Sequence, residues 1–300
     1  MLSKTTVVLG AGGPWGTAWM AGLILGLEDS GIDVRHPQAI IGSSAGAILG
    51  ARLASGMSPL ELFEDQTSIE SQTRQLSVFQ RLMPPKSEQA APASSSPVSM
   101  LSILAKEWDD EEQRIRAVCE LAVNAKTVSW DQFKSVMLAT APSNAPWPAV
   151  RFVATAIDVD ARSLQAFDAH SGVEMTVATL ASCAIPGLWP LVPINGRRYT
   201  DGGSWGSGDN AHLAAGASSV LIISPMAAQR AHRKTGAAVL DRDIQTLRSA
   251  GTRVHLLAAD EASLTARGTG MPNPASMKAA AEAGRVQGRQ EAVALQRALS

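Results

Sequence analysis

Residues 5–16 read TTVVLGAGGPWG, and residues 39–46 read AIIGSSAG. Each stretch is a short apolar run that ends in small residues, which is typical of a buried strand entering a tight turn. Helical patterns follow both runs, over residues 16–30 and 43–54, and glycines at their ends favour termination there. The order strand, helix, strand, helix predicts parallel strands joined by helical crossovers.

Strand patterns return after the middle of the chain. They cover residues 151–157, 163–167, 220–223 and 254–257, and an Ala-rich helix is predicted over residues 276–299. We therefore predict one α/β domain over residues 1–300, a three-layer α/β/α arrangement around a mainly parallel central sheet.

The middle of the chain has a different pattern. Apolar residues recur there at helical spacing, which predicts a helical cap inserted into the sheet domain at residues 57–150. Within it, residues 84–99 are rich in Pro, Ser and Ala and predict a flexible loop.

Composition excludes several classes of protein. The 300 residues are 45% hydrophobic, which excludes disorder for most of the chain, and 26 basic against 27 acidic residues leave no field to attract nucleic acid. Two cysteines exclude a disulfide framework and a Cys-rich zinc site. Because the five histidines are scattered singly, we expect no metal site, and no sequence feature calls for a cofactor.

The uncharged stretch over residues 5–27 resembles a membrane span or a secretory signal. Its glycines and Pro14 would break a spanning helix, and the apolar run before them is too short for a signal peptide. We expect a soluble, cytoplasmic protein.

Gly42-Ser43-Ser44-Ala45-Gly46 is a GxSxG motif between a predicted strand and a predicted helix. This context is typical of a nucleophile elbow, in which a sharp turn exposes the middle serine and the glycines leave room for the backbone. The same pattern recurs around Ser204, but in a Gly-rich loop. The structural alternative for Ser44 is a helix N-cap.

The glycine-rich loop at residues 10–16 follows the first predicted strand. Such a turn presents backbone N–H groups to an anion, either a pyrophosphate or the oxyanion of a tetrahedral intermediate. A dinucleotide site requires G-x-G-x-x-G, but Trp15 occupies the sixth position and Gly42-Ser43-Ser44 stands where an acidic residue would bind the ribose. The sequence therefore favours the oxyanion.

Asp201-Gly202-Gly203 follows a hairpin-like segment with an Asn195-Gly196 turn. On its own, an aspartate beside two glycines is most often a plain turn. It is also a place where a carboxylate can be held rigidly for use as a base.

These three motifs, in this order, resemble the patatin-like phospholipase family, and residues 181–187 resemble the small-residue segment that the family has before a proline. The resemblance covers most of the chain. It implies hydrolysis of acyl esters of lipids by a Ser–Asp dyad without histidine, with Ser44 as nucleophile and Asp201 as base. It places the oxyanion hole on the backbone around Gly12 and Gly13, and it implies a lipid or acyl-ester substrate met at a membrane or micelle surface.

The chain departs from that pattern in its first loop. Ala11 and Trp15 stand where the family usually has Gly and Arg, and Pro14 has no N–H to donate. A hole formed by Gly12, Gly13 and Trp15 remains. Because losing one donor typically costs about 10²–10³ in rate, we expect weak activity or activity on other substrates.

Two alternatives remain open. A Ser–His–Asp hydrolase would use Ser44, Asp201 and one of His212, His232 and His255, although only two predicted strands precede Ser44, where that fold has three. A non-catalytic relative would bind an acyl ligand or a partner, with Trp15 blocking the hole.

Overall fold

The computed structural model describes residues 2–82, 102, 103, 106, 108, 110–138, 146–230, 234–268 and 273–299. The loop predicted over residues 84–99 lies outside the described residues.

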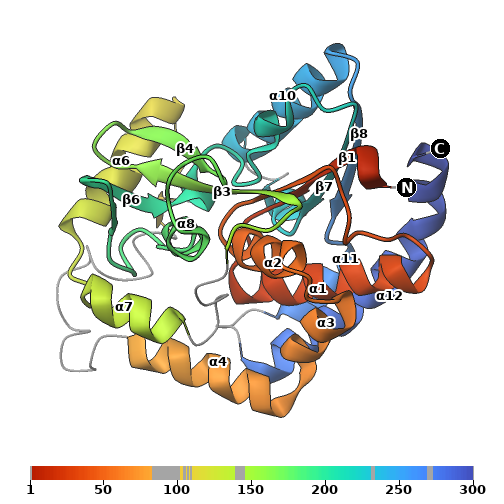
Figure 1. The fold of residues 1–300 in the computed structure, drawn as a ribbon, viewed down its shortest axis with the longest axis horizontal. Helices are drawn as coiled ribbons and strands as arrows, with labels where there is room; N and C mark the ends of the chain where they lie inside the picture. Colours follow the sequence, from red (N-terminus) through yellow and green to blue (C-terminus); the bar gives the residue numbers. More distant parts are fainter. Residues whose placement is uncertain are drawn as a thin grey trace.

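The centre of the molecule is an eight-stranded sheet with the order β5–β6–β3–β2–β1–β7–β8, and β4 pairs with β3 (Figure 1). The strands are β1 (Thr5–Leu9), β2 (Ala39–Gly42), β3 (Arg151–Asp158), β4 (Ser163–Phe167), β5 (Val192–Ile194), β6 (Arg197–Asp201), β7 (Ser219–Ser224) and β8 (Arg253–Ala258). The pairs β1–β2, β2–β3, β1–β7 and β7–β8 are parallel, whereas β4, β5 and β6 pair antiparallel. The predicted mainly parallel sheet is confirmed.

Helices cover both faces of this sheet (Figure 1). Those that follow the early strands or end the chain are α1 (Gly13–Asp29), α2 (Ala45–Ala54), α8 (Met175–Ser182), α9 (Ala227–Arg230), α10 (Lys234–Ser249), α11 (Glu261–Arg267) and α12 (Pro274–Leu299). The described part of residues 57–150 contains α3 (Pro59–Thr67), α4 (Ile69–Leu82), α6 (Glu111–Asn124) and α7 (Trp130–Met137). Short 3-10 helices are η1 (Leu2–Lys4), η3 (Gly202–Ser204) and η4 (Ala211–Ala214). That residues 57–150 act as a cap stays a prediction.

Alternation along β1 separates the two faces of the sheet. Val7 and Leu9 contribute to the larger core, which contains residues of α1, α2 and α12. Val8 points the other way, into the core formed with α10. Burial on both faces explains why the strands read as continuous apolar runs, and it confirms the predicted three layers.

The pairing of α1 with α12 fixes the helix that follows the glycine-rich loop. Gly22 and Gly26 of α1 meet the backbone of α12 so closely that a methyl group on Gly22 would lie 1.9 Å from the Ala281 carbonyl oxygen. The buried Trp19 indole N–H bonds to the Gln287 side chain of α12. Close backbone contact and this bond hold α1 in place.

The start of α1 differs from the predicted start at residue 16. The helix begins at Gly13, with Gly12 at the N-cap and Pro14 in the first turn. Proline is favoured there because its missing N–H would have no helical partner and its φ is already helical. Part of the predicted glycine-rich loop is therefore the first turn of α1.

None of the helices in the described ranges combines the length and the apolar character of a membrane span.

Candidate active site

The GxSxG motif forms a sharp turn between β2 and α2. Ser44 has φ 54° and ψ −117°, a conformation that is costly for a residue with a side chain. A methyl group on Gly42 would lie 2.5 Å from the Gly46 carbonyl oxygen, and one on Gly46 would lie 1.9 Å from the Leu9 carbonyl oxygen. A side chain at either position would collide with backbone atoms, so the tight turn requires glycine there.

The Ser44 side chain bonds to Asp201. Its Oγ donates to Asp201 Oδ2 at 2.8 Å, across 157 positions of sequence. Ser44 stands at the N-cap position of α2, but its side chain makes no capping hydrogen bond to that helix. Both side chains are buried, with 8% of Ser44 and 4% of Asp201 exposed.

Asp201 ends β6, and its second carboxylate oxygen is also bonded. Oδ1 accepts the Gly203 N–H at 2.6 Å. Burial raises the pKa of Asp201 to about 7, although the bonds from Ser44 and Gly203 act in the opposite direction. A carboxyl group with a pKa near neutrality can both accept and release a proton at physiological pH, which is the property required of a general base.

The glycine-rich loop borders this pair. A methyl group on Gly203 would lie 2.5 Å from Ala11 Cβ and 3.0 Å from Ser44 Cβ, so the three residues are immediate neighbours. Gly13 has φ +60°, and the space around the position of its missing side chain is open. The first N–H groups of a helix have no partner within it, and here the first bond within α1 runs from Gly16 to Gly12. The N–H groups at Gly12, Gly13 and Trp15 precede that bond.

The Trp15 side chain points into the core. Its indole stacks on Trp19 with 6.3 Å between ring centroids, and 3% of the residue is exposed. Arg267, the last residue of α11, has its guanidinium group 5.4 Å from the centroid of the Trp15 ring.

The segment at residues 181–187 connects Ser44 to Asp201 through hydrogen bonds. Ser182 Oγ accepts the Ser44 N–H at 2.9 Å, and Cys183 Sγ donates to the Ser44 carbonyl oxygen at 3.2 Å. The Ala184 carbonyl oxygen accepts the Asp201 N–H at 3.0 Å. The sequence identified this segment only by resemblance, and the structure gives its physical role.

Comparison with known proteins now adds to this geometry. The family model described as patatin-like phospholipase matches residues 7–215. The chain belongs to the patatin-like phospholipase family. Membership supports lipid acyl hydrolysis in general. No curated protein matches the chain.

Among solved structures, this patatin-like chain is similar to VipD from Legionella pneumophila, with 12% identity and a TM-score of 0.46 over 97% of this chain and 67% of that one. It is similar to the type III effector protein ExoU, with 19% identity and a TM-score of 0.41 over 99% of this chain and 54% of that one. A structure of full-length ExoU with SpcU from the type III secretion system of Pseudomonas aeruginosa gives 19% identity, a TM-score of 0.41 and coverage of 99% and 53%. The chain thus spans about half the length of ExoU.

The histidines in the described part of this patatin-like protein stand apart from Ser44 and Asp201. His212 Nδ1 lies 3.4 Å from Asp243 Oδ2, and burial lowers the pKa of His255 on β8. Among the described residues, no histidine bonds to Ser44 or Asp201. His232 lies outside the described residues.

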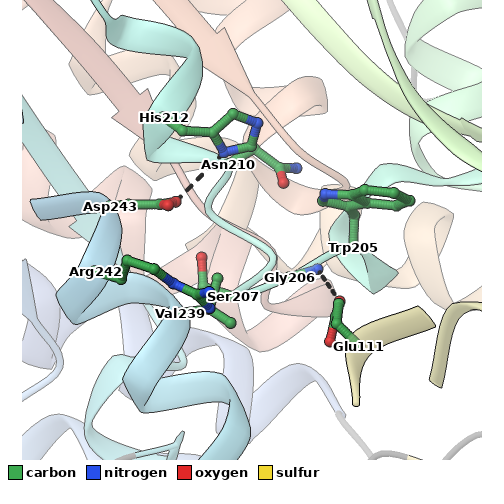
Figure 2. A pocket seen from close by; sticks show the side chains of 9 residues that line it. All are labelled: Glu111, Trp205, Gly206, Ser207, Asn210, His212, Val239, Arg242 and Asp243. Carbon is green, nitrogen blue, oxygen red and sulfur yellow. Dashed lines mark hydrogen bonds and ion pairs between the residues drawn. The ribbon is translucent and has the colours of Figure 1, made fainter. Parts of the chain in front are cut away.

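A pocket of about 190 Å³ lies between the segment at residues 205–212, α6 and α10 (Figure 2). Its lining residues are Glu111, Trp205, Gly206, Ser207, Asn210, His212, Val239, Arg242 and Asp243. Asn210 belongs both to this wall and to the hydrogen bonds around Ser44, a role that sequence reasoning missed.

The described residues contain no group of three or more His, Cys, Asp or Glu side chains arranged to hold a metal ion. Cys119 and Cys183 are buried, and burial raises the pKa of both thiols.

Proposed function

We propose that this protein hydrolyses carboxylic esters of lipids through a dyad of Ser44 and Asp201. The observation that carries the proposal is the 2.8 Å hydrogen bond between Ser44 Oγ and a buried carboxylate whose pKa is about 7. Ser44 stands in a strained turn at the start of a helix, as nucleophiles of acyl hydrolases do. Family membership supports the same class of reaction.

In the proposed mechanism, Asp201 accepts the Ser44 proton while Oγ attacks the acyl carbonyl carbon. The carbonyl oxygen becomes negative, and the N–H groups of Gly12, Gly13 and Trp15 stabilise it. The tetrahedral intermediate collapses, the C–O bond to the alcohol breaks, and Asp201 returns the proton to the leaving oxygen. Asp201 then takes a proton from water as the water oxygen attacks the acyl-serine. The bond between the acyl carbon and Ser44 Oγ breaks, Asp201 returns the proton to Oγ, and the acid is released.

The proposed mechanism requires Asp201 to begin each cycle ionised. Because its pKa is about 7, the ionised fraction rises as the pH rises through 7. We therefore expect kcat/KM to increase over that range and to level off above it.

The proposed substrate is a lipid or lipid-like ester, met through transient contact with a membrane or micelle. We propose one domain over residues 1–300, in which the helical region at 57–150 covers the approach to Ser44. Binding to such surfaces is often accompanied by movement of covering segments.

Hydrolysis of p-nitrophenyl butyrate and of phospholipid in mixed micelles tests the proposal. Ser44→Ala should reduce turnover of both to the uncatalysed rate, whereas Ser204→Ala, at the other GxSxG match, should retain activity. Equal turnover by wild type and Ser44→Ala would overturn it. A folded wild type that binds acyl ligand without turnover would favour the non-catalytic alternative.

A further inference from the structure

Asn210 is a buried residue whose side chain bridges three parts of the proposed site. It is 1% exposed, and its Nδ2 donates to Ser43 Oγ at 2.9 Å, to the Gly202 carbonyl oxygen at 3.0 Å and to Thr155 Oγ1 at 3.3 Å. These acceptors belong to the turn that carries Ser44, to β3 and to the Gly202–Gly203 segment that follows Asp201. Its backbone is left-handed, with φ 57° and ψ 39°, a conformation that asparagine tolerates better than most residues.

The bond to Gly202 acts on Asp201 through a single peptide group. The Gly202 carbonyl and the Gly203 N–H are the two ends of one planar unit. Asn210 bonds to the carbonyl end, and Asp201 Oδ1 accepts the N–H end at 2.6 Å. The orientation of this peptide therefore fixes both bonds together.

The bond to Ser43 acts on the nucleophile side. Ser43 immediately precedes Ser44, and its Oγ lies 2.8 Å from Thr155 Oγ1. Asn210 thus joins the hydroxyl pair that fastens the elbow to β3. One amide group contacts the residue before the nucleophile and the peptide that bonds to the base.

We infer that Asn210 is a positioning residue that keeps Ser44 and Asp201 aligned, by fixing the Gly202–Gly203 peptide and the Ser43 hydroxyl together. The inference rests on the proposed function, because alignment matters only if the pair reacts. Asn210 does not touch the reacting atoms. It acts through Ser43 and Gly203.

Other bonds hold the segment that carries Asn210. The Gly206 N–H donates to Glu111 Oε1 of α6 at 3.0 Å, as Figure 2 shows. The Ala11 N–H donates to the Gly208 carbonyl oxygen at 3.0 Å. Because neither bond involves the Asn210 side chain, we expect the backbone of residues 205–210 to keep its conformation when that side chain is changed.

The pKa of Asp201 can be used to test this role, because it depends on the bond from the Gly203 N–H. Burial and the bonds from Ser44 and Gly203 account for its pKa, and no charged side chain of the described residues contributes to it. One ionisable neighbour is the buried Cys183 thiol, whose pKa burial and the Asp201 charge raise well above the usual range. Asp209, which directly precedes Asn210, is also buried. A change in the Gly203 bond therefore appears directly in the titration of Asp201.

Two variants remove the Nδ2 donor in different ways. Asn210→Gly keeps the left-handed backbone without strain, and Asn210→Ala removes the amide without adding an ionisable group beside Asp201. Asn195→Gly is the matched control, because Asn195 is also left-handed, with φ 50°, but lies in the exposed turn between β5 and β6.

The first readout is the pH titration of the Gly203 amide by ¹H–¹⁵N NMR. We expect a midpoint of about 7 in wild type and in Asn195→Gly. In both Asn210 variants the Gly203 bond weakens, and the midpoint should rise by about one unit. A purely structural role would lower stability and leave the midpoint in place, and that result would overturn the inference whether or not the protein is an enzyme.

The second readout is the pH profile of ester hydrolysis. A rise of one unit leaves about a tenth of Asp201 ionised at pH 7 in place of about half, so kcat/KM should fall about 5-fold there through kcat, with KM little changed. An unshifted profile in both Asn210 variants, with wild type active, would refute the inference alone. Absence of turnover in wild type with a shifted Gly203 midpoint would refute the proposed function and leave the positioning role supported.

Discussion

Replacing Asp201 with asparagine should stabilise the fold at alkaline pH while it removes the proposed base. Asparagine has the same shape, and it can still bond to Gly203 and Ser44, but it carries no charge to bury. Asp201 is 4% exposed, so the wild type holds a carboxylate away from water whenever that group is ionised.

The magnitude follows from the pKa. Burial raises it from 3.8 to about 7. A raised pKa means that the folded state keeps its proton longer than the unfolded state, so the contribution to stability is complete below pH 4 and is lost as the pH rises through 7. A shift of about three units at about 1.4 kcal/mol each gives a loss of about 4 kcal/mol across that window.

Urea unfolding of wild type and Asp201→Asn at several pH values measures this difference. Between pH 5 and pH 8 the free energy of unfolding of the variant, relative to that of wild type, should rise by about 3 kcal/mol. About two of the three pH units between the unfolded and folded pKa values of Asp201 lie above pH 5. Ser44→Ala retains the carboxyl group and should keep a pH-dependent stability, with the fall displaced to higher pH because the bond from Ser44 that lowers the Asp201 pKa is lost. A stability difference between Asp201→Asn and wild type that is equal at pH 5 and pH 8 would refute the raised pKa.

Three further predictions concern the contacts around this pair. Ser182→Ala removes the acceptor of the Ser44 N–H and should cost about 1–3 kcal/mol in urea unfolding with a lower kcat; unchanged stability and kcat would show that the bond is dispensable. Glu111→Gln weakens the bond to Gly206 and the ion pair with Arg114. Because the same segment holds the Ala11 N–H through the Gly208 carbonyl oxygen, the glycine-rich loop should become less fixed and kcat in the ester assay should fall; a kcat equal to wild type would contradict this. Gly284→Ala places a methyl group 2.3 Å from the Trp19 carbonyl oxygen and should destabilise the protein by about 1–3 kcal/mol, a result that a neutral unfolding curve would exclude.

Much of the fold and the turn at Ser44 could be predicted from local sequence, whereas the roles of Ser44 and Asp201 as a dyad came from the family resemblance. The apolar run of β1 and the small residues around Ser44 are contiguous, so their meaning does not depend on distant contacts. The start of α1 was misplaced because Pro14 reads as a breaker until its position in the first turn is known.

The supporting residues could not be predicted because their roles depend on long-range contacts. Ser182 bonds to a residue 138 positions away, and Asn210 bonds to one 167 positions away. A lone serine or asparagine carries no local pattern that indicates such a bond. The family resemblance indicated the neighbourhood of Ser182 but not its hydrogen bond.

Labelling with a fluorophosphonate probe, followed by peptide mapping, tests the central claim most directly. An activated serine attacks the phosphorus of the probe and becomes covalently labelled, which needs no knowledge of the natural substrate. We predict label on wild type at Ser44 and none on Ser44→Ala, with Asp201→Asn strongly reduced above pH 7. Label at Ser204, label of equal intensity on Asp201→Asn, or no label on folded wild type would contradict the assignment of Ser44 and Asp201 as nucleophile and base.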